Sequence, residues 1–537
     1  MSSHSSHDTL SPSQTLHIHG SCLMHSLTPD RHPTGIHSLP VELLARIFVL
    51  GSYIAQNNDE SPFLLKPDPS YNAADPTSFA VAVSHVSQHW RQVSLHTHVL
   101  WNTLHFREVS HISRARTFIA RASRSASYVL NILVETVAEE DHAPGVTLYR
   151  EEISTIFELI IPHVSRWRAF HLKICDNECK GQARRFLGSC GPAPRLETLQ
   201  LYHFENYLTS QRLYLATYRP PVAVFSNTLP CLKHVSLIGV NLQWATSPYL
   251  KNLHNLELAL HLDNIRPPYQ WWDRMLRSSP HLKNLCLHYS GPREATGDPN
   301  LAWKGVGEKI RLEELEELRL TDLDPDYLCN LMERLAAPNV RRLELELPDQ
   351  DFTDFVDLLT KGPSEDQGGI EHARMSPVPN INSLQFLTVH ALECGVEAWN
   401  NFLYACSGLQ GLEVDFSRVG SQFWDIFTEQ SIKKKLLLPG LKSFKLSGIL
   451  GEQVALALKK RDETFQDQPL ATERWIVRWS EKQQGKDIEL DKLVKAGIWT
   501  STLVGRTIII DTFYDEEDED YELEEQEGDE EDTVVEN

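Results

Sequence analysis

The chain has 537 residues, 41% of them hydrophobic, and a formal net charge of −22. This length and composition are typical of a folded chain with several domains or one extended array. The acidic balance argues against nucleic acid as a partner, because phosphate binding needs a basic surface. No run approaches the ~20 apolar residues of a membrane helix, so no membrane contact is expected. The nine cysteines follow no regular spacing, which favours reduced thiols in the cytoplasm or nucleus.

Both ends of the chain are predicted to be disordered. The N-terminal arm, residues 1–37, is rich in Ser, His, Thr and Pro, and the tail, residues 513–537, is acidic. The tail has 14 acidic residues between Asp515 and Asp532, which account for most of the net charge of −22. Such segments bury too little apolar surface to offset their chain entropy. The tail is either a solubilising segment or a contact for a basic partner.

Residues 38–106 are predicted to form a small all-α domain. Its first helix is expected to start at Pro40, which suits the first helical position, and to end near Gly51. Apolar residues one turn apart give this helix an apolar side; they are Leu43 with Ile47 and Leu44 with Phe48.

A second helix is expected after Asp75 and Pro76. Its apolar residues follow a 4-3-4-3 spacing, which predicts one continuous stripe: Phe79, Val83, Val86, Trp90 and Val93. The stretch 52–77 between the two helices is polar and has four prolines, so it is interpreted as an inserted loop.

Two stretches of this domain carry a recognisable pattern. They read Leu39-Pro40-x-Glu42-Leu43-Leu44-x-x-Ile47-Phe48 and Val83-x-x-Val86-x-x-x-Trp90-Arg91, followed by Leu100-Trp101. This pattern resembles the F-box, whose members bind the small Skp adaptor and through it a cullin. The resemblance implies that adaptor contact or hairpin core comes from Leu39, Pro40, Leu43, Ile47, Val86 and Trp90. An ordinary helical hairpin that caps the next domain is the alternative.

From residue 107 to 451 the chain is predicted to form an irregular solenoid. A basic amphipathic helix at Ser113–Ser125 and a strand at Tyr128–Val134 come first. An L-x-x-L-x-L unit then recurs about every 31 residues on average. The nine units begin at Leu196, Leu232, Leu253, Leu282, Leu315, Val340, Leu384, Leu409 and Leu441, and a weaker copy begins at Trp167.

Helix-like stretches lie between several of these units, for example at Tyr327–Ala336 and Val396–Cys406. Strand, turn and helix repeated at intervals predict an α/β class of leucine-rich-repeat-like type. Residues 452–512 lose the rhythm and are expected to cap the array with a helix near Glu452–Asp462 and strands at Trp475–Trp479 and Thr507–Asp511. Lys361–Asn380 is interpreted as a surface loop. The combination of F-box and degenerate repeats resembles the large F-box families of mushroom-forming fungi.

In strands of this kind the leucines point inward, and the residues beside the last leucine line an exposed sheet. The residues predicted to bind substrate there are Tyr202, His288, Arg319, Glu344, Glu346, His390, Glu413 and Asp415. Because acidic side chains dominate this set, a protein substrate with a basic patch is expected. The alternatives are that this face is unoccupied or that loops cover it.

The chain carries no recognised catalytic motif. A phosphate-cradling glycine loop, a G-x-S-x-G elbow and an H-E-x-x-H helix are all absent from the sequence. Cys175, Cys179, Cys190 and His171 form its one cysteine cluster, at spacings unusual for structural zinc. No catalytic residue, cofactor or metal is therefore predicted.

The F-box resemblance implies a substrate-receptor subunit of a cullin-type ubiquitin ligase. Such a subunit is not itself an enzyme, because it acts by raising the local concentration of a target lysine. The alternative is a repeat scaffold outside any ligase, whose acidic tail binds basic proteins such as histones. A third possibility is an enzyme with an unrecognised site.

Overall fold

The computed structural model describes residues 36, 39–54, 61–66, 78–125, 127–139, 141–203, 221–293, 309–361, 381–419, 423, 426, 437–447, 474–480 and 507–513. The predicted N-terminal arm apart from Ile36, and the acidic tail apart from Phe513, lie outside these residues. So do the helix expected near Glu452–Asp462 and all but the first residue of the loop expected at Lys361–Asn380.

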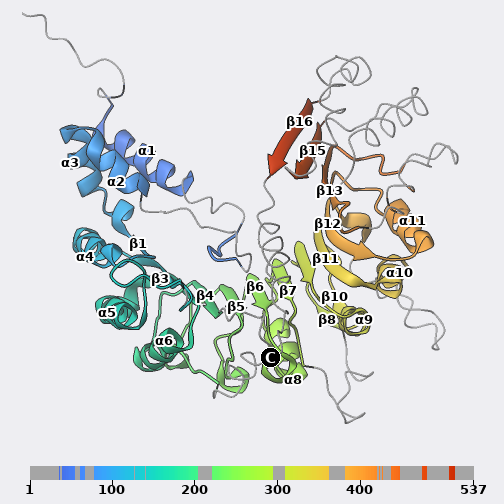
Figure 1. Cartoon of the computed structure of the whole chain (residues 1–537), viewed down its shortest axis with the longest axis horizontal. Helices are drawn as coiled ribbons and strands as arrows, with labels where there is room; N and C mark the ends of the chain where they lie inside the picture. The colour runs from blue at the N-terminus through green and yellow to red at the C-terminus, as the bar shows by residue number, and fades with distance from the viewer. Residues whose placement is uncertain are drawn as a thin grey trace, which may run out of the picture.

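A parallel sheet of 14 strands forms the body of the protein. Its strands follow one another in chain order and bend into an arc, with helices along the outer side (Figure 1). They are β1 (Thr103–Phe106), β2 (Leu130–Glu135), β3 (Trp167–Ile174), β4 (Thr198–His203), β5 (His234–Ile238), β6 (Asn255–Ala259), β7 (Asn284–His288), β9 (Glu317–Thr321), β11 (Arg342–Asp351), β12 (Phe386–Glu393), β13 (Gly411–Asp415), β14 (Ser443–Ser447), β15 (Arg474–Ser480) and β16 (Thr507–Phe513). A separate pair joins β8 (Ile310–Arg311) to β10 (Leu335–Ala336). The predicted α/β class is confirmed.

The crossovers between strands run through helices on the outer side of the arc. The α-helices there are α4 (Ser110–Ala122), α5 (Arg150–Ile160), α6 (Asn177–Ser189), α8 (Tyr269–Arg277), α9 (Pro325–Met332), α10 (Thr353–Lys361) and α11 (Val396–Ala405). The 3₁₀ turns between strands are η3 (Ile161–Arg166), η4 (Phe225–Asn227), η5 (Trp244–Thr246), η6 (Asp263–Ile265) and η8 (Ile381–Ser383), and η2 (His98–Trp101) precedes β1. Parallel strands need such crossovers, since a tight hairpin can join only antiparallel strands.

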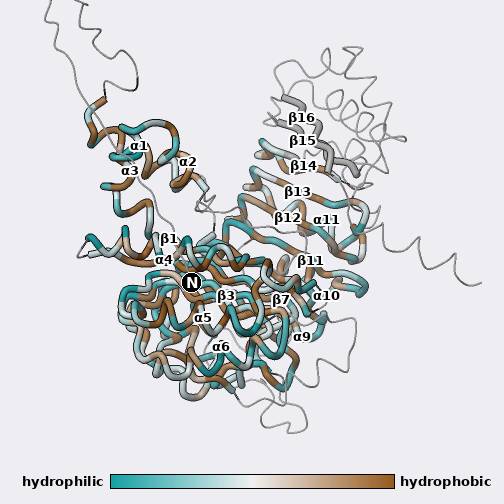
Figure 2. Tube along the Cα trace, turned by 60° about the vertical axis from the view of Figure 1, so that its left-hand side comes forward, coloured by the Kyte–Doolittle hydropathy of each residue, from teal (hydrophilic) through white to brown (hydrophobic). Residues whose placement is uncertain are grey.

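Each predicted L-x-x-L-x-L unit places its last two apolar positions on a strand from β4 to β14. The pairing keeps these positions in register, so that Leu256 lies opposite Leu285 and Leu285 opposite Leu318. These leucines are buried against the outer helices, and hydrophobic residues recur along successive strands (Figure 2). Full burial of one such side chain contributes about 1.5–3 kcal/mol, so the repeated pattern stabilises the whole sheet.

The sheet extends past both ends of the repeats. At its start, β1 lies within the stretch 38–106 that was expected to be all helical, and it pairs with β2. At its other end, the strands expected at Trp475–Trp479 and Thr507–Asp511 are confirmed as β15 and β16. They pair in parallel with each other, and β15 pairs with β14, so they continue the sheet in the same order.

Three helices precede the sheet and stand off from its β1 end (Figures 1 and 2). They are α1 (Val41–Ile54), α2 (Ser78–Val86) and α3 (Gln88–His96). The prediction of one helix from Phe79 to Val93 is wrong, because Ser87 interrupts it. The backbone of Ser87 is extended, and its hydroxyl accepts a hydrogen bond from the Trp90 amide at 3.1 Å, which makes Ser87 the N-cap of a new helix.

The predicted end of the first helix at Gly51 is also wrong, since α1 continues to Ile54. A Cβ atom at Gly51 would lie 2.3 Å from the ring carbon Cζ of Phe79. Glycine therefore serves here to let α2 pack closely against α1, at the usual cost of glycine within a helix.

Candidate docking faces

The helix α1 is apolar on two sides, and only one of them is buried. Leu44 and Phe48 point into the core, and the Phe48 ring lies 4.9 Å from that of Trp90 in α3, centroid to centroid. On the other side, Leu43 and Ile47 are 50% and 44% exposed, and Leu50, one turn further, is 53% exposed. Residues at i, i+4 and i+7 share one face of a helix. We call Leu43, Ile47 and Leu50 the front stripe.

The six residues predicted to contact an adaptor fall into two groups. Pro40, Leu43, Ile47 and Val86 are exposed, as a docking surface requires. Leu39 and Trp90 are partly buried, and Trp90 packs on the hairpin core. The Leu100-Trp101 pair is buried, and the Trp101 indole donates a hydrogen bond to the Ser94 carbonyl oxygen at 2.9 Å, so it joins the helices to the start of the sheet.

The inner face of the sheet carries the residues predicted to bind substrate. One row of this face runs across the strands in register, through Gln200, Ser236, Glu257, Cys286, Arg319, Glu344, Thr388, Glu413 and Lys445. From β7 to β14 this row is mainly polar and half-exposed, and His288, Glu346, His390 and Asp415 lie beside it.

Three of the four acidic residues predicted on this face are paired with basic side chains of the same chain. Glu344 lies 3.2 Å from the Arg319 guanidinium and 4.0 Å from His390. Glu413 lies 3.0 Å from Lys445, and Glu346 contacts Arg418 at 2.9 Å. The expected excess of negative charge is thus largely balanced within the protein. A basic substrate would have to exchange these ion pairs for its own.

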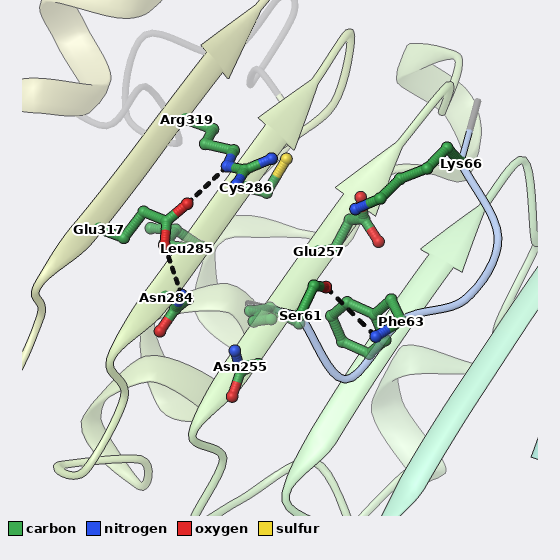
Figure 3. Close-up of a pocket in the computed structure, with 11 residues that line it drawn as sticks. Ser61, Phe63, Lys66, Asn255, Glu257, Asn284, Leu285, Cys286, Glu317 and Arg319 are labelled. Atoms are coloured by element: carbon green, nitrogen blue, oxygen red, sulfur yellow. Dashed lines mark hydrogen bonds and ion pairs between the residues drawn. The ribbon is translucent and has the colours of Figure 1, made fainter. Parts of the chain in front are cut away.

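The inner face over β4, β5 and β6 is covered, and apolar side chains lie there beside a buried polar row. Residues 61–66, which we call the strap, lie against it (Figures 1 and 3). Leu65 is 2% exposed and packs with Leu133, Tyr202, Ile238 and Ala259. Tyr202, predicted to bind substrate, is consequently buried at 2% exposure. The expectation that the whole insert forms a loop of the helical domain is therefore wrong for residues 61–66.

Sequence reasoning missed the strap, although a signal was present. Ile238 and Ala259 occupy positions of β5 and β6 that should face solvent, and Leu133 does so on β2. Apolar residues at outward positions of a strand indicate that another segment covers them. The apolar run Phe63-Leu64-Leu65 within the polar insert is the segment that does so here.

The cysteine cluster has no metal-site geometry. Burial raises the pKa of the Cys175 thiol to about 11 and raises that of Cys179 further, with the Asp176 carboxylate adding to the effect. The ring of His171 is buried and bonded to Gln200. Within the described part of the chain, no three His, Cys, Asp or Glu side chains could together hold a metal ion.

Comparison with known proteins adds no assignment. No family model matches this chain, and no curated protein matches it. None of the helices in the described ranges is long and apolar enough to span a bilayer.

Proposed function

We propose that this chain is a substrate-receptor subunit of a cullin-type ubiquitin ligase. In this proposal α1, α2 and α3 form an F-box hairpin that binds the Skp adaptor, and through it a cullin. The strands and outer helices form an irregular, leucine-rich-repeat-like solenoid whose inner face holds a protein substrate. The protein would act in the cytoplasm or nucleus. It would hold a target lysine of the substrate close to the ligase and would not itself catalyse the reaction.

The observation that carries this proposal is the front stripe. Its three large aliphatic side chains are about half exposed, although the helix that bears them is fully packed on its other side. An apolar row on a helical module that stands off from the body favours a partner protein. The F-box pattern of the sequence names that partner as the Skp adaptor.

The inner face supports the substrate role. It presents charged side chains of both signs along β7 to β14, at the face of the arc away from the outer helices. The carboxylates of Glu344, Glu346 and Glu413 would bind a substrate segment with basic residues once their internal ion-pair partners are displaced.

The test is adaptor binding by the purified full-length chain, measured by calorimetry. Burial of the exposed half of one such aliphatic side chain would contribute about 1 kcal/mol, and a charge placed there would add a desolvation cost. Leu43→Asp together with Ile47→Asp is therefore expected to weaken adaptor binding at least ~100-fold, since 1.4 kcal/mol corresponds to a factor of ten.

The matched control is Val396→Asp on α11, where valine is 46% exposed. It changes an equally exposed apolar side chain on a helix of the sheet region and should leave adaptor binding intact. Absence of adaptor binding by the folded wild type, or equal binding by the double variant, would refute the proposal. Deletion of residues 514–537 should spare adaptor binding; under the histone-scaffold alternative it would instead abolish the binding of basic proteins.

A further inference from the structure

The strap is held to the sheet by a side-chain amide. The Gln200 Oε1 atom accepts hydrogen bonds from the Leu64 and Leu65 amides at 3.1 and 3.0 Å. The Gln200 Nε2 atom donates to the Leu65 carbonyl oxygen at 2.7 Å. Gln200 thus satisfies both the backbone N–H and the backbone C=O of one residue, Leu65, as a neighbouring strand would. This contact depends on the backbone of the bound segment and not on its side chains.

The Gln200 amide is oriented by a chain of polar groups on the inner face. His171 Nδ1 donates to Gln200 Oε1 at 2.9 Å, since that oxygen can only accept. Gln200 Nε2 also donates to Ser236 Oγ at 3.3 Å, and Ser236 donates to Glu257 at 2.5 Å. These four residues come from β3, β4, β5 and β6, in register. The donor and acceptor are therefore positioned by the sheet itself.

Side-chain selection comes from the neighbouring apolar pocket. Leu133, Tyr202, Ile238 and Ala259 surround Leu65 and exclude water from it. A pocket lined by aliphatic and aromatic side chains accepts a leucine-like residue and rejects a charged one. Beyond the strap, the inner face continues as a hollow over β6, β7 and β9, where Glu257, Cys286 and Arg319 line it together with Phe63 and Lys66 (Figure 3).

The strap makes no strand pairing with the sheet within the residues the structure describes. It is held by Gln200, by the pocket around Leu65 and by the buried Phe63 side chain. It comes from the insert between α1 and α2, and Leu65 lies 135 residues before Gln200. This arrangement is that of a bound peptide rather than of an element that builds the sheet. The Gln200 amide, the apolar pocket around Leu65 and the hollow over β6, β7 and β9 lie next to one another along the inner face.

We propose that β4, β5 and β6 form a binding site for an extended peptide with an aliphatic residue at the position of Leu65, and that the strap fills this site in cis. This inference rests on the proposed function, for which it names the substrate class: a segment resembling Phe-Leu-Leu-Lys. A substrate must displace the strap, whose effective concentration is high because it belongs to the same chain. Because the strap competes for the site, only substrates that bind tightly or are present at high concentration would occupy it.

The experiment measures binding of a fluorescent synthetic peptide that copies residues 59–68 to the full-length chain. Wild type should bind it weakly, because the site is filled. Leu65→Asp, which cannot enter the apolar pocket, should empty the site and bind the peptide at least tenfold more tightly. Adding Gln200→Ala to Leu65→Asp should abolish that gain. A peptide with aspartate at the position of Leu65 is the matched control and should not bind.

A second measurement needs no variant. Excess peptide should displace the strap in the wild-type chain and speed hydrogen exchange at the Leu64 and Leu65 amides. The proposal is overturned if Leu65→Asp, folded by its thermal transition, binds the peptide no better than wild type and the peptide leaves exchange at these amides unchanged. Adaptor binding, measured in parallel, separates this failure from failure of the proposed function, because the strap contributes nothing to the front stripe.

Discussion

Lowering the pH from 7 to 5 is expected to destabilise this protein through its buried histidines. The contribution of one of them, His261, can be measured separately. Its ring is fully buried; Nε2 donates to the Val240 carbonyl oxygen at 3.2 Å, so Nδ1 accepts from the Ser290 hydroxyl at 2.8 Å. Burial is the main cause that lowers the pKa of His261 to about 3, and the nearby Arg266 cation acts in the same direction. The folded protein therefore keeps this histidine neutral at pH 5.

The magnitude follows from linkage. In the unfolded chain a histidine has a pKa of about 6.5. Between pH 6.5 and about 3 the His261 ring is therefore protonated in the unfolded state and neutral in the folded state. Stability contributed by the depressed pKa is fully present above 6.5 and is lost as pH falls toward 3. Each pH unit within this window costs about 1.4 kcal/mol, so His261 alone should cost about 2 kcal/mol between pH 7 and 5. His171, whose burial lowers its pKa to about 4, should cost about as much.

Urea unfolding of the wild type and of His261→Gln at pH 7 and pH 5 measures this cost. A glutamine amide can donate to the Val240 oxygen and accept from Ser290, but it does not titrate. The variant should lose about 2 kcal/mol less than wild type on acidification, whatever its stability at pH 7. Ser290→Ala is the control, because it weakens the site without removing the titrating ring. If His261→Gln and wild type lose the same free energy, the reasoning is wrong.

Two further substitutions test the fold. Leu285→Ala on β7 should lower the free energy of unfolding by about 2–5 kcal/mol, because the side chain is buried and leaves a cavity; a loss under ~1 kcal/mol by chemical denaturation would contradict the buried register of the strands. Ser87→Ala should cost about 1 kcal/mol through loss of the N-cap of α3. An unchanged thermal transition would instead indicate that α2 and α3 do not depend on a break at Ser87.

The local spacing of apolar residues was sufficient to predict the strands of the sheet from β4 to β14. The spacing of Leu253, Leu256 and Leu258 within one unit, repeated along the chain, predicted that these apolar positions of each unit point into the core, and the structure confirms their burial. The reason is that side chains alternate between the faces of a strand, so short-range spacing alone determines the inward set. The break at Ser87 could not be read this way, because the apolar spacing continues across it and only the cap geometry ends the helix.

The sequence alone determined that α1 is apolar on two sides, that leucines repeat on strands, and that acidic residues follow them on the inner face. Only the tertiary structure decided that Leu44 and Phe48 are covered while Leu43 and Ile47 are not, that Glu344 and Glu413 have cations beside them, and that the strap reaches Gln200. The physical reason is the separation along the chain between the residues that interact. Periodicity is a property of a few consecutive residues, whereas the choice of partner depends on which distant segments the folded chain brings together.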